Sequence, residues 1–281
     1  MALDYDALMA LPPLVTEHVV TVRDTILYAL GVGATDLRHV YEDGLEALPT
    51  MAAVLAYPGF FAREPRYGLT WQKILHGEQS IELHRPLPVQ GRLIGSTTID
   101  QLIDRGVEKG AIMLSSRTIH HAETGEHLAT VRSTSFLRGD GGFGQRGATT
   151  MPQPHLVPED RAPDLTALLP TGLGQATLYR LSGDYNPLHI DPAVARSAGF
   201  DRPILHGLCT YGVVGRGLLE ALCANDGTLV RRMDARFSSP VYPGETMRLE
   251  IWRHGPGRAA FRAYAEERGV LVLNNGNIVF D

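Results

Sequence analysis

The sequence predicts an α+β fold in which two antiparallel sheets each wrap around a helix. Two strand-like segments separated by a Glu-x-Gly turn occur once in each half of the chain, after helical material and after a Pro-containing stretch that the two halves share. Hairpins that follow a helix fit antiparallel sheets better than alternating parallel βαβ units, and their recurrence supports an internal duplication. The paired segments are 111–120 with 126–136 and 259–266 with 270–279, and the shared stretches before them are 85–93 and 239–247.

In the first half, helical material is expected at residues 22–30 and, weakened by Pro49, at residues 45–55. The stretch from about Gly139 to Ala167 is rich in Gly, Pro and charged residues, a composition typical of connecting segments. We therefore expect three parts: an N-terminal domain at residues 1–140, a linker at residues 141–165 and a C-terminal domain at residues 166–281.

The second half opens with residues 179–189, whose sequence YRLSGDYNPLH places a carboxylate, an amide and an imidazole within six positions. Gly183 allows a tight bend, and Pro187 biases the residue before it away from the helical region. Asp184 and His189 can therefore converge instead of pointing apart, which is the arrangement needed to activate a water molecule. A capped turn uses the same residue types, so this pattern alone leaves a purely structural role open.

Two helices are expected after this motif. Asp191 is a suitable N-cap and Pro192 suits a first helical turn, so residues 193–198 should form a short helix that ends at Gly199. The apolar run within residues 203–222 indicates one buried helix.

Glycines recur along the buried helix, at positions 207, 212, 215 and 217. Each would cost about 1 kcal/mol relative to alanine in an ordinary helix, so we expect close approach of other backbone or of a ligand. Gly207 lies near the start of the helix and should have a free backbone N–H. The helix dipole makes that N–H a suitable donor to an oxygen that becomes negative during a reaction.

Composition places the chain among ordinary globular proteins. Its 281 residues are 44% hydrophobic, and its net charge of −5 argues against general nucleic-acid binding. No segment has the pattern of a secretory signal, and no apolar stretch reaches the roughly 18 residues of a membrane span. Cys209 and Cys223 both fall in the apolar helix, which favours packed, reduced thiols in a cytoplasmic protein. No His-x-x-x-His or Cys-x-x-Cys spacing occurs, so neither a metal nor a redox cofactor is expected.

Residues 182–189, with the sequence SGDYNPLH, and the later pair His206-Gly207 resemble the signature of the MaoC-like, R-specific enoyl-CoA hydratases. Outside this motif, the chain resembles the two-hot-dog form found in the hydratase part of peroxisomal multifunctional β-oxidation enzymes. The resemblance covers nearly the whole chain and implies a double hot-dog fold. It also implies a single catalytic centre, with a first hot dog that accommodates the acyl chain. The stretches that carry the longer resemblance are 23–33, 75–79 and 141–144.

The same resemblance implies a role for each site residue. Asp184 and His189 would hold the catalytic water, and Asn186 would help to orient them. Gly207 would donate its backbone N–H to the thioester carbonyl. The implied partner is an acyl-CoA substrate, and a homodimer of double hot-dog chains is expected. The substrate-binding residues implied are His76, Gly77, Arg105, Tyr185, Pro187, Leu188 and Phe237.

With the Asp184 and His189 pattern, the resemblance implies reversible hydration of trans-2-enoyl-CoA to (R)-3-hydroxyacyl-CoA in fatty-acid or related acyl-CoA metabolism. Thioester hydrolysis stays open as an alternative, because hot-dog proteins include thioesterases, and so does a dehydratase acting on acyl carrier protein. A noncatalytic acyl-thioester binder is disfavoured by the intact motif. A histidine beside a helix start often only satisfies backbone groups, so we expect the Gly207 backbone, and not the His206 ring, to act.

Overall fold

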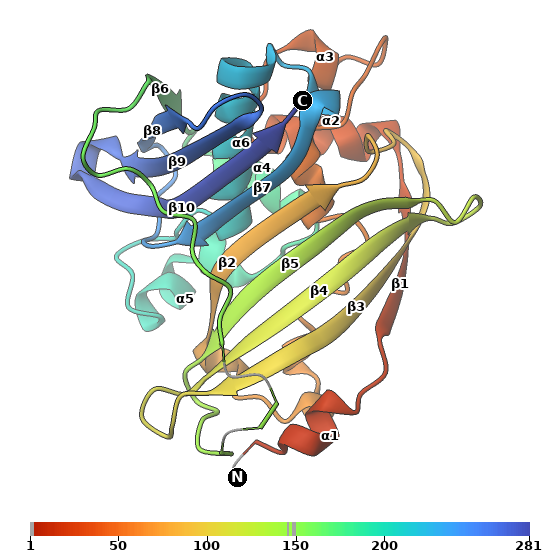
Figure 1. Cartoon of the computed structure of the whole chain (residues 1–281), viewed down its shortest axis with the longest axis vertical. Helices are drawn as coiled ribbons and strands as arrows, with labels where there is room; N and C mark the ends of the chain where they lie inside the picture. Colours follow the sequence, from red (N-terminus) through yellow and green to blue (C-terminus); the bar gives the residue numbers. More distant parts are fainter. Residues whose placement is uncertain (1–2, 145, 148–149) are drawn as a thin grey trace.

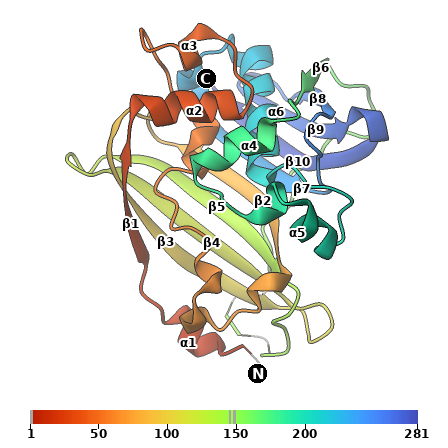
Figure 2. The same ribbon diagram turned by 180° about the vertical axis from the view of Figure 1, so that it is seen from behind.

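The computed structural model describes residues 3–144, 146–147 and 150–281. In these residues, ten strands form one sheet with antiparallel neighbours, in the order β1-β3-β4-β5-β2-β7-β10-β9-β8-β6. Figure 1 shows the sheet in front of the helices, and Figure 2 shows the helices from behind, gathered on one face. The strands are β1 (Leu14–Val20), β2 (Ile74–Leu83), β3 (Gly91–Asp104), β4 (Ala111–His121), β5 (His127–Leu137), β6 (Leu165–Pro170), β7 (Val230–Phe237), β8 (Thr246–Arg253), β9 (Arg258–Ala265) and β10 (Val270–Phe280).

The helices divide into α-helices and short 3-10 helices. The α-helices are α1 (Tyr5–Met9), α2 (Val22–Gly31), α3 (Leu37–Val40), α4 (Gln175–Tyr179), α5 (Pro192–Ser197) and α6 (Gly207–Cys223). The 3-10 helices are η1 (Pro49–Ala53), η2 (Phe61–Arg63), η3 (Pro65–Tyr67), η4 (Trp71–Lys73), η5 (Arg180–Ser182), η6 (Pro187–His189), η7 (Gly227–Leu229) and η8 (Glu266–Arg268). No helix in the described ranges is long and apolar enough to cross a membrane.

The two halves share one sheet, whereas the sequence predicts two. Strand β2 of the first half pairs with β7 of the second, in a register that runs from Glu78 opposite Arg236 to Glu82 opposite Arg232. The pairing satisfies the backbone groups of two strands that would otherwise be sheet edges. The predicted hairpins are confirmed as β4 with β5 and β9 with β10.

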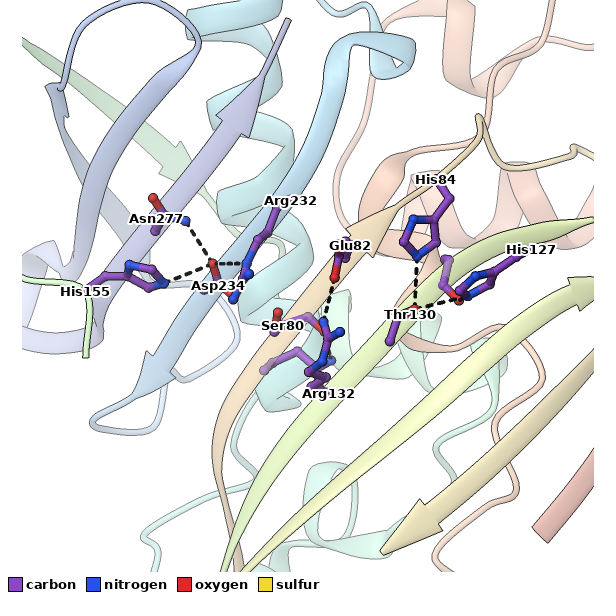
Figure 3. Close-up of polar contacts among 12 residues, drawn as sticks. Ser80, Glu82, His84, His127, Thr130, Arg132, His155, Arg232, Asp234 and Asn277 are labelled. Atoms are coloured by element: carbon purple, nitrogen blue, oxygen red, sulfur yellow. Dashed lines mark hydrogen bonds and ion pairs between the residues drawn. The ribbon is translucent and has the colours of Figure 1, made fainter. Parts of the chain in front are cut away.

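The outer face at this junction carries polar contacts (Figure 3). Asp234, only 8% exposed, accepts hydrogen bonds from Arg232 Nε at 2.8 and 3.0 Å and from Asn277 Nδ2 at 2.9 Å. His155 Nε2, from the connection between the halves, lies 3.3 Å from the same carboxylate. The connection thus contacts the face of the sheet opposite to the helices (Figure 1). Residues 145, 148 and 149 of the expected linker, and residues 1–2 of the expected N-terminal domain, lie outside the described residues.

Helix α6 confirms the predicted buried helix and lies where the halves meet. A Cβ added at Gly212 would lie 2.5 Å from Val32 Cγ1, and one added at Gly215 would lie 2.4 Å from Thr50 Cγ2. Close approach therefore exists at these two positions, but side chains of the first half make it, whereas the sequence predicted backbone or a ligand. Helix α6 has 17 residues.

The longest helix of the first half is shorter than α6 of the second. Helix α2, with 10 residues, confirms the helix expected at 22–30. The helix expected at 45–55 is reduced to η1, which Pro49 opens at its first position. Proline suits that position because it lacks the backbone N–H that would go unpaired there. A segment of η1 and coil consequently packs against the inner face of β2 and β5.

Candidate active site

The motif loop is held by its own short side chains. Gly183 has φ of +115°, which ends η5 in a conformation that glycine adopts readily. Asp184 Oδ1 accepts from the N–H of Asn186 at 3.1 Å, and Asn186 Oδ1 accepts from the N–H of Leu188 at 3.1 Å. Two successive side-chain caps therefore turn the chain sharply between Asp184 and His189.

The imidazole of His189 is buried and has a defined tautomer. Its Nδ1 lies 2.9 Å from the carbonyl oxygen of Ile204. A carbonyl only accepts hydrogen bonds, so Nδ1 carries the proton and donates it. In the neutral ring, Nε2 is then an unprotonated acceptor. This is the form of histidine that can take a proton from water.

The ring of His206 lies directly on that of His189, with centroids 3.8 Å apart and planes inclined by 28°. His206 Nε2 donates to the backbone carbonyl of Asp184 at 3.2 Å, and His206 Nδ1 is buried without a partner. One carboxylate oxygen of Asp184 and one ring nitrogen each of His189 and His206 lie within 4.8 Å of one another. This spacing suits a shared water molecule, and it would also suit a metal ion.

Burial keeps both imidazoles neutral. Desolvation lowers the pKa of His189, against the raising effects of its hydrogen bond to Ile204 and of the Asp184 carboxylate. Desolvation also lowers the pKa of His206, with a further lowering by His189. A carboxylate and a neutral imidazole, both hydrogen-bond acceptors, therefore lie close together.

The start of α6 lies beside this group. His206 is the N-cap of the helix, and its side chain makes no capping hydrogen bond, so the first N–H groups, including that of Gly207, have no acceptor within the helix. A Cβ at Gly207 would lie 3.4 Å from the Phe237 ring. Phe237 in turn packs against His76, with ring centroids 4.7 Å apart. The three elements α6, β7 and β2 thus meet at the helix start.

The predicted pair His76-Gly77 lies at a bulge of β2, where the pairing with β5 shifts register between His76 and Glu78. Desolvation lowers the pKa of His76 to about 4, opposed by the contact with the Glu78 carbonyl and by the charge of Asp184. The His76 side chain nevertheless keeps an edge open to solvent. A Cβ at Gly77 would lie 2.4 Å from Phe136 Cε2, so the packing of Phe136 leaves no room for a larger side chain at this position.

Arg105 is not brought into this group. It is exposed in the turn after β3, and strands β4 and β5 separate β3 from β2 in the sheet. Within the described ranges no contact joins it to Asp184. Tyr185 and Pro187 are exposed on the motif loop, and Leu188 is half-buried beside them. The guanidinium of Arg180 lies 4.9 Å from the centre of the Tyr185 ring.

Sequence reasoning discounted the His206 ring and did not consider Tyr57. Desolvation raises the pKa of Tyr57 to about 12, and the Asp184 charge adds to that rise, so the phenol lies close enough to the carboxylate to sense it. The only signal for His206 was its place before Gly207. Tyr57 lies in coil more than a hundred residues before the motif, and no local pattern marks it.

Cys209 and Cys223 are both free and buried, as expected for packed thiols. Cys209 Sγ donates to the carbonyl of Gly31 at 3.4 Å, and burial raises the pKa of its thiol well above the ordinary value. A thiol held in its neutral form is a poor nucleophile, so Cys209 is unsuited to covalent catalysis.

Solved structures with the same fold show the class to which the chain belongs. It has a double hot-dog fold: a Mycobacterium tuberculosis protein whose structure is described by that fold superposes with a TM-score of 0.54 over 96% of this chain and 95% of the other, at 18% identity. A crystal structure of a MaoC-like dehydratase from Phytophthora capsici superposes with a TM-score of 0.89 over 99% of both chains, at 36% identity.

The chain belongs to the MaoC-like hydratase 2 family. The family model of the MaoC like domain matches residues 156–275, and that of the MFE-2 hydratase 2 N-terminal domain matches residues 18–139. It is 43% identical to the 3-hydroxyacyl-thioester dehydratase Y of Mycobacterium tuberculosis, over 100% of this chain and 99% of that protein. It is also 38% identical to a probable enoyl-CoA hydratase 2 of Dictyostelium discoideum, over 94% of this chain and 92% of that protein.

Proposed function

We propose that this protein reversibly hydrates trans-2-enoyl-CoA to (R)-3-hydroxyacyl-CoA. The chain is a hydro-lyase of the enoyl-CoA hydratase 2 and 3-hydroxyacyl-thioester dehydratase class, the activity named for relatives that match it over almost its full length. The observation that carries the mechanism is the grouping of Asp184, His189 and His206 within 4.8 Å of one another, with His189 Nδ1 occupied by the Ile204 carbonyl and its Nε2 left as an acceptor.

In this mechanism, Asp184 and His189 Nε2 accept the two hydrogens of one water molecule. Asp184 or His189 takes one proton of the water as the water oxygen bonds to C3 of the enoyl group. The electrons of the C2–C3 double bond then form an enolate, with negative charge on the thioester oxygen. The proton taken from the water then passes to C2, so that one C–O and one C–H bond replace the double bond. General acid–base assistance of this kind contributes about 10² to 10⁴ in rate.

The enolate oxygen needs a donor that is already in place. The Gly207 N–H has no acceptor within α6 and carries the positive end of the helix dipole. Loss of one such donor typically costs about 3 to 4 kcal/mol in activation free energy. The Phe237 ring beside Gly207 would limit how the thioester can enter.

The proposal is tested with crotonyl-CoA and decenoyl-CoA. Purified protein should remove the conjugated-enoyl absorbance without releasing free thiol, and the product should have the R configuration. Thiol release at the same rate would replace the hydratase with a thioesterase. Loss of absorbance only with the acyl carrier protein thioester would reassign the carrier. An S product would contradict the proposed stereochemistry.

We further propose that the chain acts in the cytoplasm as a homodimer. Two buried, free cysteines fit a reducing compartment. Closed twofold dimers are the commonest symmetric assembly of soluble proteins, which supports this choice. Light scattering after size exclusion tests the dimer, and subcellular fractionation tests the location. A monomer at micromolar concentration, or enrichment in an organelle, would contradict the respective proposal.

A further inference from the structure

A buried guanidinium lies in the first half, away from the residues assigned to catalysis. Arg117 of β4 is only 5% exposed. One of its nitrogens donates to the carbonyls of Ala52 at 3.3 Å and Ala53 at 2.7 Å, at the end of η1. Its Nε is buried and has no partner. Within the described ranges no carboxylate forms an ion pair with it.

The two carbonyl contacts do not account for a charge at this place. Desolvation lowers the pKa of Arg117 to about 10, so the interior opposes the cation without removing it at neutral pH. A buried ion without a counter-ion costs several kcal/mol, whereas a neutral donor could satisfy the Ala52 and Ala53 carbonyls at less cost. The position therefore suits an anion that is supplied from outside the chain.

A second buried polar atom without a partner belongs to the residue that pairs with Arg117 in the sheet. Thr97 of β3 is directly opposite Arg117 in the β3–β4 ladder, and its hydroxyl is buried without a hydrogen bond. Thr97 also lines a cavity of about 170 Å³ whose other walls are mainly apolar. Those walls include Leu8, Met9, Leu11, Phe61, Tyr67 and Ile99.

Tyr57 connects this place with the candidate active site. The Arg117 guanidinium lies 5.3 Å from the centre of the Tyr57 ring. Apart from desolvation, the pKa of Tyr57 is raised by Asp184 and lowered by Arg117, so both charges lie near the phenol. Tyr57 thus senses the charges of both Asp184 and Arg117, and Thr97, the ladder partner of Arg117, lines the cavity.

The sheet register gives the approximate separation of Arg117 from His76. Arg117 is four residues along β4 from Met113, which lies opposite Ser135, and Ser135 lies opposite His76. That is about 13 Å along a strand and about 10 Å across two inter-strand spacings. A short acyl group at the Asp184 end would not span the distance, whereas a medium or long chain would.

We propose that the first half recognises the far end of the acyl chain, and that the preferred substrate is a trans-2-enoyl-CoA whose chain ends in a carboxylate. The carboxylate oxygens accept hydrogen bonds from Arg117 Nε and from the Thr97 hydroxyl. The inference rests on the proposed hydratase activity and adds the chemical class of its substrate. A bound anion satisfies both orphan donors and compensates the buried charge.

The test compares pairs of trans-2-enoyl-CoA substrates of equal length, one ending in a methyl group and one in a carboxylate, from short to long chains. Above the length that reaches Arg117, we expect kcat/KM to favour the carboxylate by about tenfold or more, as for a charge-assisted hydrogen bond. Arg117→Met should abolish this preference, and Arg117→Lys should retain part of it. Arg132→Met removes an exposed arginine paired with Glu82 on β2 and is the matched control.

The preference is a ratio of two rates measured on one preparation, so partial loss of folded enzyme in a variant does not alter it. Equal or lower kcat/KM for the carboxylate at every length would overturn the proposal, as would a preference that survives Arg117→Met. A chain that ends in a hydroxyl and is hydrated as well as the carboxylate would also overturn it. Hydration of the methyl-ended series alone leaves the proposed function standing, whereas no hydration of any substrate refutes that function itself.

Discussion

His189 and His206 stack face to face, with ring centroids 3.8 Å apart, and each is held by one backbone carbonyl. The carbonyl of Ile204 fixes the proton of His189 on Nδ1, and the carbonyl of Asp184 fixes that of His206 on Nε2. The two stacked rings therefore have different roles. Nε2 of His189 is a hydrogen-bond acceptor, whereas Nε2 of His206 binds the backbone carbonyl of Asp184.

Asp184→Asn and His189→Ala test the assignment of the base. Each substitution removes one of the two acceptors for water, so we expect hydration of crotonyl-CoA to fall by about 10² to 10⁴. Circular dichroism and the unfolding midpoint of Asp184→Asn should match the original protein, because the amide can still cap the turn through its oxygen. Asp201→Asn, an exposed aspartate after the same motif, is the matched control and should keep full activity. Undiminished turnover in both site variants would refute the assignment.

The pH dependence of kcat/KM should follow His189. The neutral ring is the active form, and its pKa lies below the ordinary value of 6.5. The acid midpoint of kcat/KM should therefore lie below pH 6.5, and activity should fall as the pH drops through that midpoint. Measurement of kcat/KM in overlapping buffers decides this, and a midpoint above 6.5 would contradict it. His254→Gln changes an exposed histidine and should leave the profile unmoved.

Folding stability should change with pH in the same window. In the folded chain the pKa values of His76, His189 and His206 are all lowered from 6.5. The unfolded chain thus binds more protons below pH 6.5, and the free energy of unfolding must fall as pH drops through that value. Above it these rings are neutral in both states and contribute nothing. Urea unfolding at several pH values measures the slope, and stability that rises on acidification from pH 6.5 would disprove the expectation.

His206→Phe separates positioning from stacking. Phenylalanine keeps a ring against His189 but removes the donor to the Asp184 carbonyl. We expect kcat to fall by roughly tenfold, the equivalent of one hydrogen bond, while KM changes little because the bond holds the enzyme and not the substrate. His206→Gln can donate from a similar reach and should recover part of the loss. Equal kcat in both variants and the original protein would remove the positioning role.

The local sequence was sufficient to predict those elements whose conformation depends on neighbouring residues. Gly183 and Pro187 dictate the turn of the motif loop whatever the rest of the chain does, and the structure has that turn. The start of the buried helix at Gly207 follows from the apolar run and its first glycine. The hairpins follow from alternating strand residues around a Glu-x-Gly turn.

Features that join distant segments could not be predicted in this way. The pairing of β2 with β7 depends on two edges that belong to different halves. Arg117 is flanked in β4 by Ser115, Ser116 and Thr118, and contact with the overlying residues 52–57 buries its side chain. Arg105 follows a strand as expected, but the order of the sheet separates that strand from β2. Proximity of this kind is a property of topology and not of composition.

Two glycines of α6 provide a test of the contact between the halves. Gly212→Ala and Gly215→Ala each gain up to about 1 kcal/mol in helix propensity, yet the new methyl groups would lie 2.5 Å from Val32 and 2.4 Å from Thr50. Overpacking of this degree typically costs about 1 to 3 kcal/mol, so we expect a net loss in the free energy of unfolding.

Chemical denaturation measures the loss, and Gly174→Ala is the control because a Cβ there meets nothing within 4 Å and its φ of −85° suits alanine. If Thr50 and Val32 can move aside, the propensity gain prevails and the α6 variants become more stable than the original chain. That result would show that η1 and the end of α2 are not packed rigidly on α6, and that the halves adjust to one another at this contact.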